Sequence, residues 1–491
     1  MNFVTAIFVI LYVSLAGYGL LKLVLKGERP FSILGEIPIA FVLGFGVLGW
    51  WGNFVMLLRL KLSFGLSALP LLPPFIYAIY EIVKSFKAAN KPDWRTILAK
   101  AKKIGALNYF FLAVILFAII SVVLMSLVFP LHFWDSRAIW GLKAKMLFGD
   151  GTVFSSNFID PDRIQPHFRY PLLFPLAQVF IYQALGAMDD WAVMVLVALF
   201  FPLTLIFLFD LLRLASRSLD KAAFGAAVLA VLPLYYFTDG PAHSGYADIP
   251  LGLFFLVSFG CLYLWQINRN QKLLLLGVVL SGFLPLVKNE GALLMLLNLF
   301  WLILPNNVKE WGDYFRRLII FGLIVGILIA PWILLRNNIP DVQDERYLAH
   351  LKVGEMIGNL GRVPGIANFY FRAFLGLQTS FSGVGFLWGG LWGLFCLAGV
   401  KCFLERNLID IKTWLSVLLF CSLMGVIFLV APAEGKFDPG GLVVIFFRVM
   451  VPITPLLVIL AVKQCDFPFS VVNPTIVGKV AEGSGRRKKK R

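Results

Sequence analysis

Apolar runs of about 20 residues recur along almost the whole chain, and they constrain its fold more than any other feature. A hydrocarbon layer about 30 Å thick requires about 20 apolar residues in each crossing helix, and lipid cannot hydrogen-bond an open backbone. The sequence therefore predicts an all-α polytopic membrane protein with about 13 transmembrane helices. The expected spans lie near residues 3–25, 34–58, 65–84, 108–130, 190–213, 221–238, 248–267, 272–287, 290–305, 317–336, 382–402, 413–431 and 443–463.

Lysine and arginine concentrate in a few of the segments that connect these spans. The chain has 44 basic against 27 acidic residues, a net charge of +17, although only 14% of its residues are charged. In so apolar a chain this excess indicates loop orientation, since cytoplasmic loops are basic, and nucleic acid is not an expected partner. The basic segments placed inside are 84–103, 213–221, 309–317 and 486–491. The N-terminus is then outside, together with 131–189, 238–247, 288–290, 337–381 and 432–442.

The cysteines and histidines predict neither a disulfide framework nor a metal site. The five cysteines lie in or beside apolar runs and form no Cys-x-x-Cys pair. The four histidines (His132, His167, His243 and His350) fall in the outer segments without metal-ligand spacing, which is more typical of loop or interface residues. The first apolar run is interpreted as a retained helix, because it has no basic segment at its start and no small-residue cleavage site before Lys22.

The two longest outer segments are too apolar for simple solvated loops. Residues 137–148 have helical spacing with Ser136 as a candidate N-cap, and Tyr170 to about Leu185 follows as a second amphipathic helix. We expect both helices to lie on the membrane surface. Segment 337–381 is expected to form a partly ordered cap over a cleft, because it mixes charges with aromatic residues: Asp341, Asp344, Glu345, Arg346, Tyr347, Arg362, Tyr370 and Arg372.

Candidate chemistry begins in the charged aromatic segment 133–145, directly after an apolar span. Asp135 lies where hydrocarbon meets water, a place where a carboxylate can act as a proton acceptor, although a helix N-cap or an ion pair with Arg137 is equally open. Trp134 and Trp140 offer flat faces to a sugar ring, whereas interfacial tryptophans are more often membrane anchors.

Four further charged residues lie in or at the start of apolar runs near the predicted outer face. Asp248 begins a span, so it is either a functional acid or a cap. Lys288 and Glu290 break the run from Leu273 to Leu304; if helical, their side chains point about 200° apart, so each needs another partner. Lys288 would suit a phosphate, or would reach lipid headgroups as an anchor, and Arg448 has the same two readings.

Four motifs, in order, resemble those of bacterial GT-C superfamily membrane glycosyltransferases, among them relatives of protein O-mannosyltransferases and of the lipid A aminoarabinose transferase. The motifs are Trp134-Asp135 with the basic helix after it, Tyr170–Leu173, Gly245–Leu251 and Lys288–Gly291. Two features depart from the pattern. Ser136 stands where the family has a glutamate, and about three additional helices precede the helix that leads to Asp135. The resemblance implies four parts: additional helices and a basic loop (1–107), a catalytic module (108–336), an outer cap (337–381) and C-terminal helices with a basic tail (382–491).

The resemblance implies inverting transfer of a hexosyl or pentosyl group from a polyprenyl-phosphate donor to a glycan, lipid or protein acceptor. The reaction would occur at the outer face of a bacterial plasma membrane. Asp135 would act as base, and Lys288, with Arg137 and Arg448, would hold the donor phosphate. The other expected substrate-binding residues are Trp134, Trp140, Lys143, Lys145, His167, Tyr170, His243, Tyr246, Asp248 and Glu290. No cofactor is expected with certainty, and a divalent metal stays open.

The alternative is a transporter or flippase for an anionic lipid-linked glycan. A transporter needs polar residues along the inner half of its spans to complete a pathway. The sequence shows polar residues mainly at the outer ends, and this asymmetry favours an enzyme open to one side.

Overall fold

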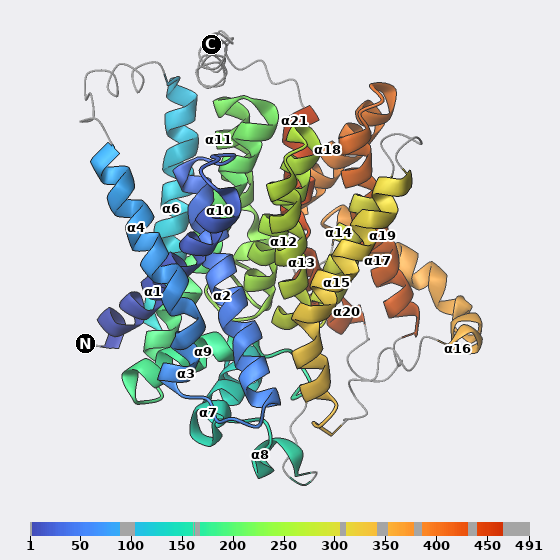
Figure 1. The fold of residues 1–491 in the computed structure, drawn as a ribbon. Coiled ribbons are helices and arrows are strands. Elements are labelled where there is room, and N and C mark those ends of the chain that lie inside the picture. Colours follow the sequence, from blue (N-terminus) through green and yellow to red (C-terminus); the bar gives the residue numbers. More distant parts are fainter. Residues whose placement is uncertain are drawn as a thin grey trace.

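The computed structural model describes residues 2–88, 104–160, 162, 167–304, 311–340, 352–377, 385–430 and 439–464. These residues form helices joined by turns and loops, with no β-strand among them (Figure 1). The prediction of an all-α fold is confirmed for this part of the chain.

Nine helices within the described ranges are long and apolar enough to cross a membrane, as expected of a multi-pass membrane protein. They are α1 (Asn2–Leu25), α2 (Ile33–Leu57), α3 with α4 (Phe64–Ala68 and Leu72–Ala88), α6 (Ala106–Val128), α10 (Asp190–Ser216), α12 (Asp248–Asn268), α15 (Trp311–Arg336), α18 (Gly385–Leu404) and α19 (Leu408–Val430). Shorter helices replace the other four expected spans: α11 (Leu219–Val231), α13 (Gln271–Val287), α14 (Glu290–Ile303), and α20 (Pro439–Met450) with α21 (Thr454–Gln464).

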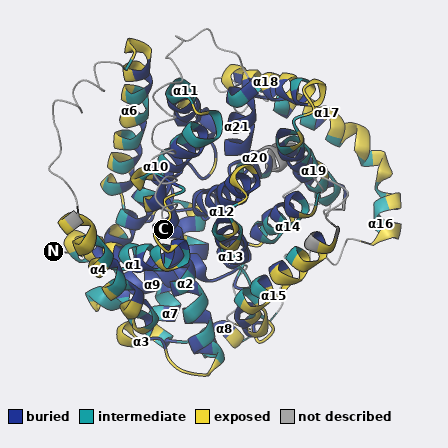
Figure 2. Cartoon of the chain, turned by 45° about the horizontal axis from the view of Figure 1, so that its top comes forward, coloured by how far each residue is buried: buried dark blue, intermediate teal, exposed yellow. Residues whose placement is uncertain are grey.

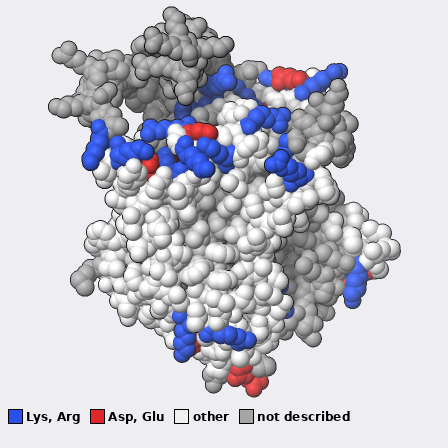
Figure 3. All heavy atoms as spheres, in the orientation of Figure 1, with Lys and Arg blue, Asp and Glu red and all other residues white. Residues whose placement is uncertain are grey.

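The surface of the helical bundle matches a protein surrounded by lipid. Figure 3 shows a broad belt without charged side chains between two ends where charges gather. Large apolar side chains in the spans are exposed, for example Phe117 (73%) in α6 and Leu397 (68%) in α18. In contrast, the span in α12 is buried throughout and lies at the centre of the bundle with α13 (Figure 2). The exposed apolar belt therefore faces the hydrocarbon layer.

Polar contacts define two opposite ends of the bundle. At one end Lys272 pairs with Glu28 (2.7 Å), and Asn108 binds Asp220. We call this end the inner end. The opposite end, at the bottom of Figure 1, holds α7 (Leu142–Asp150), α8 (Ser156–Ile159) and α9 (Leu173–Leu185), and we call it the outer end.

Labelling of single cysteines in intact cells should show which end faces the cytoplasm. Arg137 at the outer end and Ser85 near the end of α4 are both exposed, whereas Ser136 is fully buried and unsuitable. In a background without native cysteines, a membrane-impermeant maleimide should modify Arg137→Cys and spare Ser85→Cys until the cells are permeabilised. The reverse pattern would place the outer end in the cytoplasm.

Prolines shorten two of the expected spans. The span expected at 443–463 is wrong as one helix, because α20 ends at Met450, and α21 begins only after Pro452, which lacks a backbone N–H donor. The span expected at 221–238 ends at Val231, since Leu232 precedes Pro233 and takes an extended conformation (ψ 121°).

The expectation that α9 lies on the membrane surface is also wrong. Its start near Tyr170 and its end at Leu185 were predicted closely, but Leu173 to Tyr182 are all buried. A helix that is apolar around most of its circumference needs protein on all sides rather than a water-facing side. Correspondingly, α9 packs against α2 and α7.

The described part of the expected outer cap forms α16 (Val353–Gly358) and α17 (Val363–Phe374). Helix α17 packs against α19, and the hydroxyl of Tyr370 donates to the carbonyl of Cys421 (3.0 Å). The remaining charged and aromatic positions predicted for the cap lie outside the described residues: Asp341, Asp344, Glu345, Arg346 and Tyr347.

Candidate functional site

Six charged side chains from distant parts of the chain meet at the outer end. They come from the segment after α6, the loop before α12, the first residue of α12, the turn between α13 and α14, and α20. We call them the outer charge cluster, which consists of Asp135, Asp239, Asp248, Lys288, Glu290 and Arg448.

Arg448 is the centre of this cluster. One terminal nitrogen, Nη2, lies 2.6 Å from Asp135 Oδ2 and 3.1 Å from Asp248 Oδ2. The other, Nη1, lies 3.5 Å from Asp239 Oδ2, and the guanidinium stands 4.7 Å from the centre of the Tyr246 ring. Arg448 therefore connects three carboxylates and a ring through the rigid fork geometry that lysine lacks.

Lys288 is buried beside the same Asp248. Its Nζ lies 2.7 Å from Asp248 Oδ1 and 3.0 Å from Glu290 Oε1. Lys288 and Glu290 were expected to point apart only if this segment were helical, but α13 ends before Lys288, whose backbone is extended (φ −155°, ψ 157°). The tight turn also requires Gly291, where a Cβ would lie 2.0 Å from the carbonyl of Leu284.

Asp248 holds the two cations side by side. Its Oδ1 accepts from Lys288 and its Oδ2 accepts from Arg448, while only 2% of its side chain is exposed. A buried carboxylate is stable as an anion only when it is paired, and here both of its oxygens are paired. Asp248 is therefore placed to position two cations rather than to react.

Asp135 stands at the start of a π-helical turn, Ser136–Gly141. The expected capping by Ser136 is wrong: its hydroxyl donates to the carbonyl of Phe133 (2.8 Å) inside the turn. Asp135 makes no capping hydrogen bond either, and its partner is Arg448 rather than Arg137. With 15% of its side chain exposed, Asp135 is accessible from outside, which a base in a transfer reaction requires.

The aromatic and histidine neighbours differ in their environments. Trp134 is 69% exposed, so its indole is available both as an anchor and to a ligand. Tyr246 donates to Asp239 Oδ1 (3.2 Å), and burial, then the nearby Asp135, raise the pKa of its hydroxyl. His243 packs against Phe133 (5.5 Å), and burial, then His132, lower the pKa of its imidazole, so it is neutral at pH 7.

Several predicted substrate-binding residues lie outside the outer charge cluster. Lys143 is fully buried and donates to the carbonyls of His167 (3.3 Å) and Tyr170 (3.0 Å), beside the buried ring of Trp140. These four residues join α7 to the segment before α9. Lys143 stabilises the local fold, because its ammonium donates to two backbone carbonyls in the segment before α9.

The two remaining predicted cations are also apart from the cluster. Lys145 pairs with Asp190 at 2.6 Å, which fastens α7 to the start of α10. Arg137 is exposed, two residues after Asp135, and has no ion pair with a carboxylate of the described residues. A phosphate-binding role for Arg137 stays a prediction.

Asp239 is the member of the cluster that the sequence did not single out. It lies in the turn Thr238-Asp239-Gly240-Pro241, where an aspartate is ordinary. Its position nine residues before Asp248, in a segment expected at the outer face, was the available signal. The described residues contain no group of three or more histidine, cysteine, aspartate or glutamate residues arranged to hold a metal ion.

A second polar group lies at the inner end. The buried carboxylate of Asp410 in α19 accepts from Lys463 (2.8 Å), Gln464 (2.6 Å), Tyr263 (2.8 Å) and Asn407 (2.7 Å). We call these five residues the inner charge cluster. Its presence shows that the expected asymmetry, with buried polar residues mainly at the outer ends, is wrong.

Between the two clusters lies a small polar group. Asn298 of α14 donates to the hydroxyls of Ser258 and Ser281 at 2.9 Å each, and all three residues are buried. Polar side chains therefore occur along the central helices from one end to the other.

No family model matches the chain, and comparison with curated proteins and with solved structures finds no similar protein.

Proposed function

We propose that this chain is an inverting GT-C-type glycosyltransferase that moves a sugar from a polyprenyl phosphate to an acceptor at the outer end of the bundle. The observation that carries the proposal is the meeting of Asp135 with Lys288 and Arg448 around Asp248. Arg448 contacts three carboxylates at the membrane boundary. An arginine that only anchors the helix to lipid headgroups does not need these contacts.

The pair of cations suits a phosphate. Lys288 and Arg448 are fixed on opposite oxygens of one carboxylate, so a phosphate that approaches from the open side meets both positive charges. Charge-assisted contacts of this kind are about twice as strong as neutral ones, and they stabilise the negative charge that develops on a departing phosphate.

The site is acidic before the donor binds. Four carboxyl groups face two basic side chains within the cluster, so phosphate must displace a carboxyl group from a basic side chain. Of the carboxylates on Arg448, Asp135 makes the shortest contact, at 2.6 Å, and is 15% exposed. Asp248 is buried and held twice, and Asp239 lies 3.5 Å away. Donor binding at Arg448 therefore releases Asp135 toward the acceptor.

In the proposed reaction, residues of this chain accept the proton and stabilise the leaving phosphate. The acceptor oxygen or nitrogen attacks the anomeric carbon, and the bond from that carbon to the phosphate oxygen breaks. The electron pair stays on the polyprenyl phosphate beside Lys288 and Arg448, and the acceptor proton moves to Asp135. Attack from the face opposite the phosphate inverts the anomeric configuration.

A transporter or flippase of an anionic lipid-linked glycan is the second candidate. It gains support from the inner charge cluster and from the polar group around Asn298, which continue polar side chains through the bundle. The members of the inner charge cluster pair with one another, however, which is the arrangement of a structural network.

Reconstitution separates these two functions. We expect purified protein in liposomes to convert a polyprenyl-phosphate sugar with inverted stereochemistry when acceptor is supplied, and to release polyprenyl phosphate. A fluorescent polyprenyl-phosphate sugar that becomes accessible to an impermeant quencher, without a covalent product, would favour the flippase. Neither product nor movement with any polyprenyl-phosphate sugar would overturn both proposals.

Asp239→Asn should reduce transfer less than fivefold, on the order of 1 kcal/mol or below. Asp239 is 45% exposed and lies 3.5 Å from Arg448, and exposed ion pairs contribute little. The variant also removes one negative charge near the phosphate, so the donor should bind at least as tightly. Product formation measured against donor concentration tests both expectations, and a loss above 100-fold would give Asp239 a part in the chemistry.

A further inference from the structure

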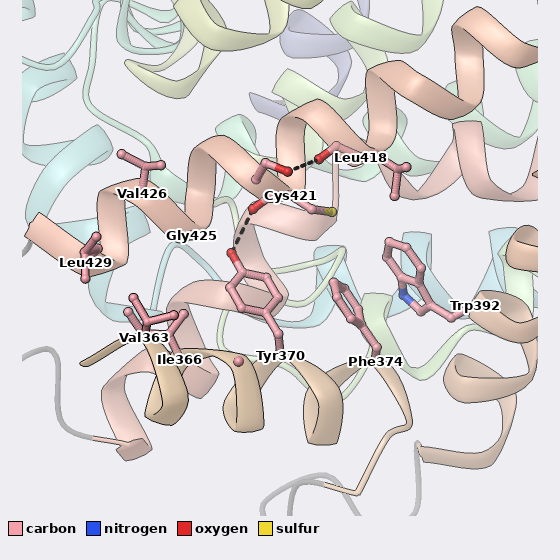
Figure 4. Close-up of a pocket in the computed structure, with 12 residues that line it drawn as sticks. Val363, Ile366, Tyr370, Phe374, Trp392, Leu418, Cys421, Gly425, Val426 and Leu429 are labelled. Atoms are coloured by element: carbon pink, nitrogen blue, oxygen red, sulfur yellow. Dashed lines mark hydrogen bonds between the residues drawn. The ribbon is translucent and has the colours of Figure 1, made fainter. Parts of the chain in front are cut away.

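An apolar groove lies between α17 and α19, with α18 at one end (Figure 4). Its volume is about 610 Å³, within the range of about 300–1,000 Å³ that is typical of ligand sites. The side chains that form it include Ile366, Tyr370, Phe374, Trp392, Cys421 and Val426. The groove occupies the half of α19 nearer the outer end, because the inner charge cluster holds the other half at Asp410.

Fixed contacts join the three helices that form the groove. The Tyr370 hydroxyl donates to the carbonyl of Cys421 at 3.0 Å, and the ring of Phe374 packs against Trp392 at 4.3 Å. On the floor, Gly425 has no side chain: a Cβ there would meet the Tyr370 ring only at 3.6 Å. The groove is therefore built into the packing of three helices.

The groove and the outer charge cluster lie against the same helix. Phe446 of α20 is fully buried and packs against Tyr370 (5.4 Å) and Phe374 (5.5 Å), which form the groove wall. Arg448, two residues later, faces Asp135 and Asp248. Side chains two residues apart point about 200° apart on a helix, so α20, with a diameter of about 10 Å, separates the groove from the cations.

We infer that this groove holds the hydrocarbon chain of the polyprenyl phosphate, an inference that rests on the proposed function. One wall of the groove, from Leu418 to Leu429, belongs to a helix that is long and apolar enough to cross a membrane, so the occupant of the groove is apolar. The cations on the other side of α20 select a lipid that ends in a phosphate. A flexible chain spans one helix diameter, with its phosphate at Arg448 and its hydrocarbon against Tyr370 and Phe374. The chain would then also press on Phe446 and hold α20 in place.

Photocrosslinking of the full-length protein in nanodiscs tests the inference. The probe is a polyprenyl phosphate with a diazirine in its chain, and labelled peptides are identified by mass spectrometry. We expect adducts on α17 and α19 that excess unlabelled polyprenyl phosphate displaces and that excess phosphatidylglycerol does not. Displacement by phosphatidylglycerol alone would make the groove an ordinary lipid site, and adducts confined to other helices would also overturn the inference.

Variants that fill the groove with a side chain test whether the groove holds the hydrocarbon chain. Gly425→Leu should lower crosslinking to α17 and α19 about tenfold. Gly393→Leu is the control, because it adds the same side chain on exposed α18 with nothing within 4 Å. Ser422→Phe fills the groove from an exposed position of α19, should Gly425→Leu fail to fold. Unchanged crosslinking in a folded groove-filled variant would overturn the inference.

These experiments separate the groove from the proposed reaction. Crosslinking needs no acceptor, so it reports on the lipid chain even if no sugar is transferred. If wild-type protein transfers sugar and Gly425→Leu does so at the same donor concentration, the function stands and the groove assignment fails. If the chain crosslinks in the groove but no sugar is ever transferred, the proposed reaction fails and the lipid site stands.

Discussion

Asp135→Asn should lower sugar transfer by a factor of about 100 to 10,000, the usual contribution of a positioned general base. The amide keeps the shape of the carboxylate but cannot take the acceptor proton. Arg448 retains Asp248 and Asp239, so the protein should stay folded. Single-turnover measurements at saturating donor would locate the loss in the chemical step.

The same variant should bind the donor as well as the wild type or more tightly. Asp135 Oδ2 lies 2.6 Å from Arg448 Nη2, and a phosphate must displace it. Removing the carboxylate charge removes this competition. Weaker donor binding in Asp135→Asn would show that Asp135 supports the site rather than competing for the cation, and transfer near the wild-type rate would exclude it as the base.

Asp239→Asn is the matched control for this experiment. Both substitutions remove one negative charge that faces Arg448, and both replace an aspartate by its amide. Only the first removes the proposed base. Equal losses of transfer in the two variants would therefore point to a general charge effect and against a specific role for Asp135.

The nine long spans and the two ends of the bundle were predictable, because lipid leaves few alternatives to a helix of about 20 apolar residues. The shorter helices were less predictable. The turn at Lys288 depends on Gly291 and on where α13 ends, and the break at Pro452 depends on how α20 and α21 pack. A run of apolar residues does not show where a helix ends or breaks.

Charge in an apolar setting was sufficient to single out five of the six members of the outer charge cluster. What the sequence could not show is how they pair, because Arg448 finds its partners 200 to 313 residues away. For Lys143 and Lys145, the sequence suggested a role that the contacts do not support. Both were predicted to bind substrate, yet Lys143 binds backbone carbonyls and Lys145 pairs with Asp190, and neither partner follows from local spacing.

Lys288→Met should weaken donor use by about 2–4 kcal/mol, a factor of about 30 to 900. The structure adds a second consequence. Lys288 also neutralises buried Asp248, and removal of one partner from a buried pair costs about 3–5 kcal/mol when nothing replaces it. Arg448 still contacts Asp248, so the loss of stability should lie below this range. Lowered activity in Lys288→Met alone would thus not separate phosphate binding from folding.

The double variant Lys288→Met with Asp248→Asn makes the separation, with Asp248→Asn alone as its control. It removes both charges of the buried pair, so the stability lost in Lys288→Met should return, as thermal unfolding would show. If Lys288 contacts the donor phosphate, transfer should stay about 30- to 900-fold below that of Asp248→Asn, and Lys288→Arg should keep part of the wild-type rate because its charge survives. If Lys288 only neutralises Asp248, the double variant should transfer sugar as fast as Asp248→Asn, and the phosphate would have to be held by Arg448 without it.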